Sequence, residues 1–296
     1  MKPPLPMVEG VGPSCLRLPA GPWKTVLAFL KERYPGVETA TWMSRMAEGR
    51  VVDEAGLRLD SGSSYRAGAC IFYYRELESE TRIPFVERIL YQDDDILAVD
   101  KPHFLPVVPS GRFLHETLLV RLRKEGKPED LAPIHRIDRE TAGVVLFSTN
   151  PKTRGDYAAL FHDRRVEKVY EALAPTIPGL GFPVTRRSRI VTGEPFFRMK
   201  ETEGEPNSET HIDVLKRMRD MTLYRLSPTT GRKHQVRLHL SALGIPILND
   251  KLYPDLGFID YDDFSSPLKL LAKSVSFRDP LTGRERHFES ERSLQP

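Results

Sequence analysis

One short segment carries the groups best suited to chemistry. Residues 135–143 read HRIDRETAG and place the carboxylate of Asp138 between the guanidinium groups of Arg136 and Arg139. The apolar run 144–147 that follows predicts a buried strand, which would hold the carboxylate on a rigid support. An acidic group flanked by arginines is either a satisfied ion pair or a nucleophile that stays ionised. These residues alone leave both interpretations open.

A second segment, 230–239, reads TGRKHQVRLH. After the turn at Gly231 its spacing predicts a helix. Basic or imidazole groups gather at the expected start of this helix: Arg232, Lys233, His234 and Arg237. Because the free N–H groups of a helix N-terminus attract anions, this end would attract phosphates. A solvated basic face is the alternative, unless Arg237 is the cation that a buried Asp138 requires.

The elements around these segments predict an α+β fold with a mixed or antiparallel central sheet. With 296 residues, of which 40% are hydrophobic, the chain can form two domains. Residues 1–22 are rich in Pro and Gly and predict an irregular tail, and 23–76 predict a small α+β module. A charged linker at 77–85 then leads to a catalytic domain at 86–296. Within it, 183–210 predict a long loop or a hairpin.

Composition narrows the classes of function. The net charge of +3 permits a nucleic-acid partner without requiring one. The two cysteines, Cys15 and Cys70, cannot form a metal cluster alone, and we expect neither a metal nor a cofactor. No apolar run approaches the roughly 18 residues of a membrane span. The Pro-rich N-terminus does not resemble a signal peptide, so we expect a cytoplasmic protein.

Six motifs, in order along residues 86–290, resemble one family. HRIDRETAG is similar to the HRLDRxTSG signature of the RluA-type pseudouridine synthases. Residues 230–250 (TGRKHQVRLHLSALGIPILND) resemble their TGRxHQxRxHxxxxGxPIxGD segment, and 168–170 (KVY) their K-x-Y element. The remaining three are 97–102 (LAVDKP), 208–210 (SET) and 271–283, similar to the family's opening, strand start and C-terminal ending. The departures from the family pattern are Ile137, Ala142, Glu209, Lys233, Asn249 and Leu271.

The resemblance implies an isomerase that breaks the N-glycosidic bond of a uridine in RNA, turns the uracil and rejoins it through C5, without cofactor or metal. It implies that Asp138 is the catalytic carboxylate, that Arg237 keeps it ionised, and that Tyr170 is a catalytic residue that stacks on the uracil and can help to remove its C5 proton. Arg136 would take the place of the extruded nucleotide. Further substrate contacts would come from Leu271, Arg232, Lys233 and His234. Taken alone, Tyr170 would be a core aromatic, and for His135 we keep a structural role.

The module at 23–76 resembles, more weakly, the small RNA-binding domain first named from a small-subunit ribosomal protein, and a degenerate packing cap is the alternative. It would contribute Arg45 to the RNA backbone contacts, together with a cluster of Arg186, Arg187 and Arg189 in the catalytic domain. We expect an RNA partner, with ribosomal RNA favoured over transfer RNA, and a monomer.

Two other classes of function remain. A non-catalytic RNA-binding or ribosome-associated protein on the same fold would be favoured by loss of Asp138 or Arg237, and both are present. An unrelated aspartate-nucleophile hydrolase would need a metal or a second carboxylate, for which Glu140 is the local candidate. We interpret Glu140 as a turn-capping acid.

Overall fold

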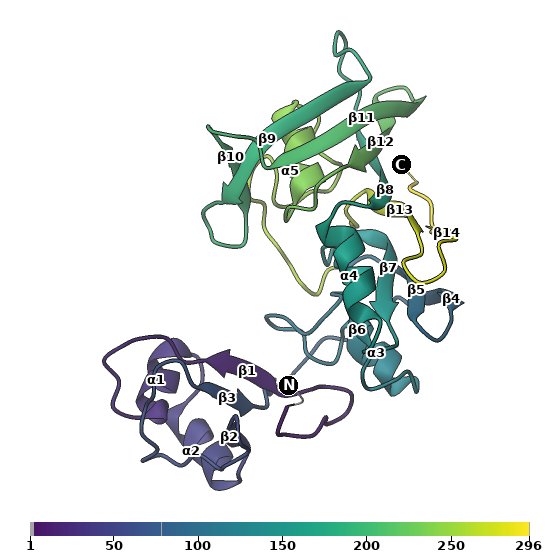
Figure 1. Cartoon of the computed structure of the whole chain (residues 1–296). Coiled ribbons are helices and arrows are strands. Elements are labelled where there is room, and N and C mark those ends of the chain that lie inside the picture. The colour runs from purple at the N-terminus through teal and green to yellow at the C-terminus, as the bar shows by residue number, and fades with distance from the viewer. Residues whose placement is uncertain (1–2, 78, 296) are drawn as a thin grey trace.

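The computed structural model describes residues 3–77 and 79–295, and its strands form two sheets (Figure 1). The larger sheet contains β4 (Arg88–Gln92), β5 (Ile96–Lys101), β6 (Ala132–Pro133), β7 (Ala142–Ser148), β8 (Val166–Pro175), β9 (Val184–Thr192), β10 (Met199–Thr202), β11 (Ser208–Arg217), β12 (Met221–Pro228), β13 (Leu270–Arg278) and β14 (Glu285–Glu289). Its order is β10-β9-β11-β12-β8-β13-β7-β5-β4, with β14 beside β13 and β6 beside β7. β7 and β13 pair in parallel and the neighbours β5 and β7 antiparallel, which confirms an α+β fold with a mixed sheet.

Two halves of this sheet meet where β7 pairs with β13. The register places Leu271 opposite Ala142 and Ala272 opposite Gly143. Gly143 has a φ of +116°, and a Cβ at this position would overlap the carbonyl group of Ala272. Glycine is therefore required at Gly143, both for its backbone conformation and for the close approach of the two strands. The catalytic segment 135–143 ends at this junction.

Helices cover both faces of β5 and β7, which explains why these strands are apolar at every position along their centres. Alternate side chains point to opposite faces. One face packs against α3 (Leu118–Lys124) and the other against α4 (Arg154–His162). The first face presents Leu97, Val99, Val145 and Phe147, and the second Ile96, Ala98, Val144 and Leu146. The strand that follows Asp138 is thus fixed from both sides.

The other half of the sheet carries α5 (Gln235–Ala242), which lies beside β9, β11 and β12 in Figure 1. Val236 and Leu240 of α5 pack on side chains from the strands, among them Ile212 and Tyr224. In the segment 183–210, β9 and β10 form an antiparallel pair, so of the two expected structures the hairpin is the correct one.

The smaller sheet, with the order β1-β3-β2, has its own core and lies at the lower left of Figure 1. It contains β1 (Ser14–Arg17), β2 (Val51–Asp53) and β3 (Cys70–Tyr73), and packs with α1 (Val26–Arg33) and α2 (Thr39–Ala47). The expectation that 1–22 is irregular is wrong for 14–17, because these residues pair with β3 as an edge strand within a Pro- and Gly-rich context. The domain boundaries at 23–76 and 86–296 stay predictions.

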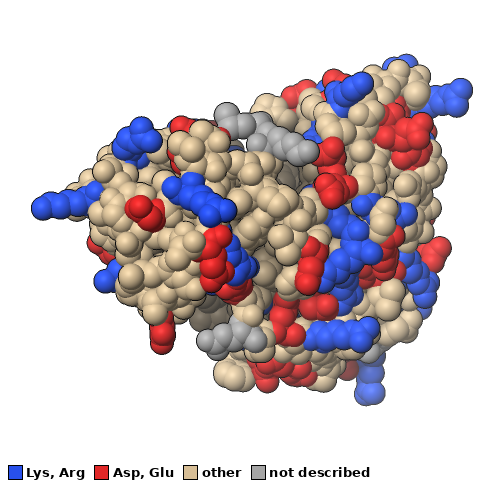
Figure 2. Space-filling model, turned by 90° about the horizontal axis from the view of Figure 1, so that it is seen from below, with Lys and Arg blue, Asp and Glu red and all other residues tan. Residues whose placement is uncertain are grey.

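The expected linker at 77–85 is docked on the larger domain where it is described. The carboxylate of Glu80 accepts hydrogen bonds from the backbone N–H groups of Leu114, His115 and Glu116 at 2.7–2.9 Å, and Ile83 is buried. Charges of both signs are interspersed on the face shown in Figure 2, in keeping with the small net charge. No helix among the described residues is long and apolar enough to span a membrane.

Candidate active site

Asp138 lies on the loop that leads into β7, with 24% of its side chain exposed. Its Oδ2 accepts a hydrogen bond of 3.1 Å from Nη1 of Arg237 on α5, 99 residues away along the chain. Arg237 therefore lies beside Asp138, as predicted from the sequence. The two halves of the sheet therefore bring together one carboxylate from the β7 side and one guanidinium from the α5 side.

Arg237 is buried, with only 1% of its side chain exposed, and has a second acidic partner. Its Nε and Nη2 donate to the two carboxylate oxygens of Asp250 at 2.8 and 2.6 Å. Asp250 also accepts from the backbone N–H groups of Leu252 and Tyr253. Asp250 was not among the predicted site residues, although it is the last residue of the motif 230–250. A buried arginine needs more than one hydrogen-bond acceptor, and this requirement could have indicated Asp250 as a second partner of Arg237.

The charges around Asp138 keep it ionised. Burial alone would raise the pKa of Asp138, but His234, Arg237 and Lys101 lower it further than burial raises it, so the pKa lies below its ordinary value. Burial lowers the pKa of His234 itself, whereas the pKa of the Arg237 guanidinium is raised by its acidic partners despite burial, so Arg237 is always charged. Arg237 is therefore the cation that keeps Asp138 ionised.

His234 connects Asp138 with an aromatic residue that was not anticipated. Its Nδ1 lies 2.9 Å from the hydroxyl of Tyr253, and its Nε2 lies 3.9 Å from Oδ1 of Asp138. The guanidinium of Arg237 lies 5.6 Å from the centre of the Tyr253 ring. Tyr253 thus contacts both basic residues that face the carboxylate.

Residues at the end of β5 and just after it hold the loop that carries Asp138 through hydrogen bonds. The ammonium group of buried Lys101 donates to the carbonyls of Pro102, Leu105 and Arg139 at 2.8–3.1 Å. His103 donates from Nδ1 to the carbonyl of Glu140 at 2.6 Å. Burial lowers the pKa of Lys101 to about 7, so its charge near Asp138 depends on pH close to neutrality.

The arginines next to Asp138 in sequence are not its partners. Arg139 donates to the carbonyls of Phe104 and Tyr261, both at 3.0 Å, and pairs with Glu140. Arg136 is exposed and makes no hydrogen bond or ion pair with any residue in 3–77 or 79–295. The interpretation of Asp138 as a carboxylate between two flanking guanidinium groups is therefore wrong, because the loop directs both side chains elsewhere.

Tyr170 and Leu271 come from adjacent strands, β8 and β13. Tyr170 is partly buried, and burial together with the charge of Asp138 holds the pKa of its hydroxyl well above the usual range. Leu271 has no exposed surface, and its strand pairs it with Ala142 of β7 on one side and Glu171 of β8 on the other. The expected contact between Leu271 and the target ring is not available in this structure.

The four basic groups expected at the start of α5 do not act as one cluster. Arg237 and His234 point inward to Asp138, whereas Arg232 and Lys233 are exposed. The side chain of Gln235 accepts from the N–H of Arg232. Of the four, Arg232 and Lys233 are therefore the two that can meet a phosphate outside the site, although Nε of Arg232 donates to the carbonyl of Asn207 at 3.2 Å.

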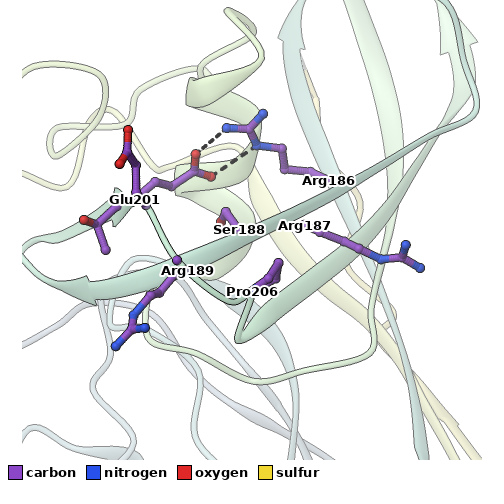
Figure 3. A pocket seen from close by; sticks show the side chains of 9 residues that line it. Arg186, Arg187, Ser188, Arg189, Glu201 and Pro206 are labelled. Carbon is purple, nitrogen blue, oxygen red and sulfur yellow. Dashed lines mark hydrogen bonds and ion pairs between the residues drawn. The ribbon is translucent and has the colours of Figure 1, made fainter.

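The arginines of β9 lie on opposite faces of their strand (Figure 3). Arg187 and Arg189 point outward, while Arg186 points inward and pairs with Glu201. They line a surface groove of about 430 Å³ that does not include Asp138. Arg187 also pairs with Glu209 at 2.6 Å. Alternation along the strand gives Arg186 an acidic partner on one face and leaves Arg187 and Arg189 on the other, although all three line one groove; their contact with RNA stays a prediction.

Arg45 is buried against Trp42 and pairs with Glu76 at 3.0 Å. The expected phosphate contact by Arg45 is wrong for this structure, because its charge is already compensated inside the N-terminal module.

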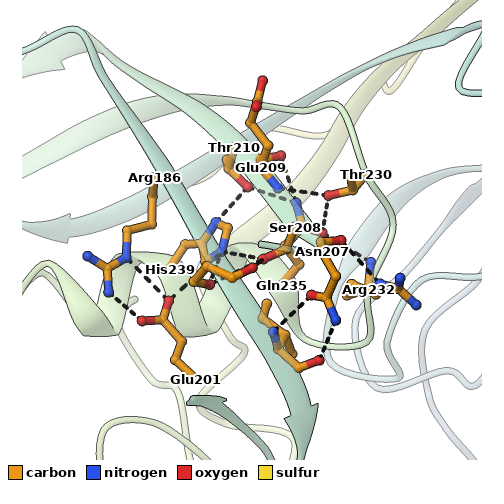
Figure 4. Close-up of polar contacts among 12 residues, drawn as sticks. Arg186, Glu201, Asn207, Ser208, Glu209, Thr210, Thr230, Arg232, Gln235 and His239 are labelled. Carbon is orange, nitrogen blue, oxygen red and sulfur yellow. Dashed lines mark hydrogen bonds and ion pairs between the residues drawn. The ribbon is translucent and has the colours of Figure 1, made fainter. Parts of the chain in front are cut away.

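Beneath α5 lies a buried polar network that the sequence did not reveal (Figure 4). The Nε2 of His239 lies 3.0 and 3.1 Å from the hydroxyls of Ser188 and Ser208, and its Nδ1 lies 2.9 Å from that of Thr210. These contacts join α5 to β9 and β11, so they fix the helix that carries Arg237. Among the described residues, no group of three or more His, Cys, Asp or Glu side chains could hold a metal ion.

Comparisons with known proteins agree with this geometry. Residues 95–242, half of the chain, match the family model described as RNA pseudouridylate synthase. The dual-specificity RNA pseudouridine synthase RluA of Vibrio vulnificus is 34% identical over 206 residues, which cover 67% of this chain and 79% of that protein. The human pseudouridylate synthase RPUSD2 is 35% identical over 173 residues, but these span only 30% of that longer protein and 56% of this chain.

Among solved structures, the human RNA pseudouridylate synthase domain containing 4 is similar, with a TM-score of 0.54 and 25% identity. The similarity covers 70% of this chain and 88% of that one. The matched family region contains Asp138, Tyr170 and Arg237. The chain belongs to the RluA-type pseudouridine synthases and is an RNA pseudouridine synthase, an isomerase of uridine in RNA.

Proposed function

We propose that Asp138 is the group that reacts with the target uridine. The observation that carries this proposal is its position: a carboxylate that is partly exposed, yet held ionised by the buried Arg237 at 3.1 Å. An ionised carboxylate can attack the ribose, add to the uracil or remove a proton, and each of these routes starts from the same charge state. Arg237 positions the carboxylate and maintains its charge.

Tyr170 would stack on the uracil. Because its pKa is raised by burial and by Asp138, its hydroxyl stays protonated at neutral pH. A protonated phenol can donate a hydrogen bond but is a poor acceptor for the C5 proton. We therefore assign Tyr170 to stacking and hydrogen-bond donation rather than to base catalysis.

The target base must leave its stack to reach Asp138, because the reacting atoms of a stacked uridine are covered. Arg136, exposed two residues before Asp138, would fill the position that the uridine vacates. Arg232 and Lys233 would contact phosphates near the site, and Arg187 and Arg189 phosphates further along β9. His234 would orient Asp138 through Nε2.

The preferred substrate in this proposal is ribosomal RNA, by analogy of the N-terminal module with a small RNA-binding domain, and transfer RNA is the alternative. We further propose that the protein acts as a monomer in the cytoplasm. Gel filtration coupled to light scattering measures the first property, and fractionation of cells the second.

The deciding experiment is tritium release from RNA labelled at uridine C5, prepared from cells that lack this protein. Ribosomal and transfer RNA are assayed separately with the wild type, Asp138→Asn and Glu140→Gln. We expect release with the wild type and Glu140→Gln and none with Asp138→Asn, and the responding fraction identifies the substrate class. Glu140 is a matched control, because it is a carboxylate on the same loop whose partner is Arg139.

Release by Asp138→Asn would refute the assignment of Asp138. Loss of release in Glu140→Gln alone would instead favour a mechanism based on Glu140. If the wild type binds RNA but releases no tritium from either RNA fraction, the result would favour the non-catalytic RNA-binding protein.

A further inference from the structure

The segment 251–266 runs past the active site with one aromatic anchor near each end. Near its start, Tyr253 is buried and contacts His234 and Arg237. Further along, the carbonyl of Tyr261 accepts from Arg139, whose guanidinium lies 5.0 Å from the centre of the Tyr261 ring. Tyr253 therefore contacts residues that face Asp138, and Tyr261 contacts the residue that follows Asp138 in the sequence. Residues 254–260 lie between these two anchors and next to the active site.

Between the two anchors, the segment exposes an aromatic side chain. Phe258 is 86% exposed. Its neighbour Ile259 is partly buried and packs on a small apolar cluster that includes Tyr253 and Leu238. The segment is thus held at Ile259 while the ring of Phe258 stands in solvent.

The turn between β9 and β10 packs on the same cluster and exposes a second ring. Phe197 and Met199 pack on the cluster, whereas Phe196 is 82% exposed. Two contacts tie this turn to the segment 251–266. Arg198 donates to the carbonyl of Pro254 at 2.6 Å, and the N–H of Met199 donates to the hydroxyl of Tyr253 at 2.8 Å.

Two phenylalanine rings are therefore presented to solvent by one connected unit next to the catalytic groups. Unpaired RNA bases stack on such rings, and a base has an apolar face that an aromatic ring can cover. The face of a phenylalanine ring offers no cation or N–H donor to a phosphate, so a base is a better occupant than the backbone. Tyr253 links this unit to His234 and Arg237 beside Asp138.

We propose that Phe196 and Phe258 are stacking platforms for unpaired bases that flank the target uridine. The proposal depends on the RNA-modifying activity of the chain but not on which residue is catalytic. It predicts a contribution to RNA affinity that does not depend on salt, because stacking releases no counterions, in contrast to the phosphate contacts of Arg187 and Arg189.

The test is filter binding of the same two RNA fractions at several salt concentrations. Phe258→Ala and Phe196→Ala should each weaken binding on the order of tenfold, with an unchanged slope of log Kd against log salt. Phe258→Trp should retain binding because it keeps an aromatic face, whereas Phe258→Leu should lose it. Leu281→Ala, at an exposed apolar residue on the turn before β14, is the matched control and should bind like the wild type.

Wild-type binding by both alanine variants would overturn the proposal. So would wild-type binding by Phe258→Leu, which would indicate apolar packing, or an altered salt slope, which would indicate a phosphate contact. Light scattering of the alanine variants completes the test: a change of oligomeric state without a change in RNA binding would assign the surface to a second copy of the chain and refute stacking. Because filter binding measures affinity and tritium release measures chemistry, tritium release by Asp138→Asn tests the catalytic assignment separately.

Discussion

Asp250 holds Arg237 through two hydrogen bonds, of 2.8 and 2.6 Å, and leaves Nη1 of the guanidinium directed at Asp138. This bidentate contact fixes the plane of the guanidinium, since two parallel N–H groups meet two oxygens of one carboxylate. The direction in which Arg237 presents its third nitrogen is therefore set by Asp250. Asp250 is a positioning residue that acts on Asp138 through Arg237.

This relationship predicts that Asp250→Asn lowers kcat by at least about tenfold, while the KM for RNA changes little, because Asp250 does not face the RNA. The amide group would place a donor against a donor of Arg237, which we expect to cost roughly 3 kcal/mol of unfolding free energy. Single-turnover kinetics and urea unfolding measure the two effects.

Asp255→Asn, at an exposed carboxylate five residues later, is the control for loss of one negative charge. A kcat for Asp250→Asn equal to that of the control would show that Asp250 does not position Arg237.

The pH dependence of the reaction tests the role of Arg237. In the wild type the pKa of Asp138 lies below its ordinary value, so the acid limb of kcat/KM should lie below about pH 4. Arg237→Met leaves the partly buried carboxylate without its permanent cation, so its pKa should rise and the acid limb should move to higher pH. Residual activity is measured across pH in both proteins.

The ion pair also contributes to stability with a definite sign. Because the folded-state pKa of Asp138 is lowered, the stabilisation of the folded protein by this ion pair is present above about pH 4 and is lost as pH falls through the folded pKa.

Arg237→Lys is the control for the kinetic prediction. It retains a positive charge, so the acid limb of kcat/KM should stay near that of the wild type. An unshifted limb in Arg237→Met would contradict this account.

Much of the fold and part of the site could be predicted from the sequence, for reasons that are visible in particular residues. The run 144–147 has the apolar character of a strand covered on both faces, and β7 forms there. Arg237 could be proposed as the partner of Asp138 because a buried carboxylate needs a cation, and the resemblance to a known family placed both residues in one site.

Side-chain directions were harder to predict, because they depend on contacts far apart in sequence. Arg139 turns away from Asp138 because its acceptors, at Phe104 and Tyr261, come from loops that the tertiary structure brings to it. Arg186 departs from its neighbours because its strand alternates. Tyr253 lay outside every matched motif, so no local pattern indicated its contact with His234.

Gly143 lies where the backbones of β7 and β13 approach closely, and substitution of this glycine should destabilise the protein. Gly143→Ala would place a methyl group against the backbone of Ala272 and would also strain a backbone with φ of +116°. We expect a loss of about 3 kcal/mol or more in unfolding free energy, together with reduced activity, because the Asp138 loop ends at this junction.

Thermal unfolding and tritium release measure both effects. The control is Gly155→Ala on α4, where a methyl group meets no atom within 4 Å. Gly143→Ala with the stability of this control would mean that β7 and β13 can separate without cost.

Acid stability tests the protonation of three histidines, of which His239 belongs to the buried network under α5. Burial lowers the pKa of His239 to about 4, of His103 to about 4 and of His135 to about 3. In the unfolded chain a histidine titrates near 6.5. Between about pH 6.5 and 4 the unfolded chain therefore binds protons that the folded protein does not, so stability falls as pH falls through this window.

Each of these histidines should contribute a slope of about 1.4 kcal/mol per pH unit to the unfolding free energy in that window. His239→Gln removes one of them, so its unfolding free energy should depend less steeply on pH by about this amount, whatever its absolute stability. Urea unfolding between about pH 4.5 and 6.5 measures the slope of the unfolding free energy against pH. This range lies below the ordinary histidine pKa of about 6.5. His162→Gln, at an exposed imidazole, serves as the control. Equal slopes for His239→Gln and the wild type would show that His239 is already protonated in the folded protein, with both ring nitrogens donating to hydroxyl oxygens.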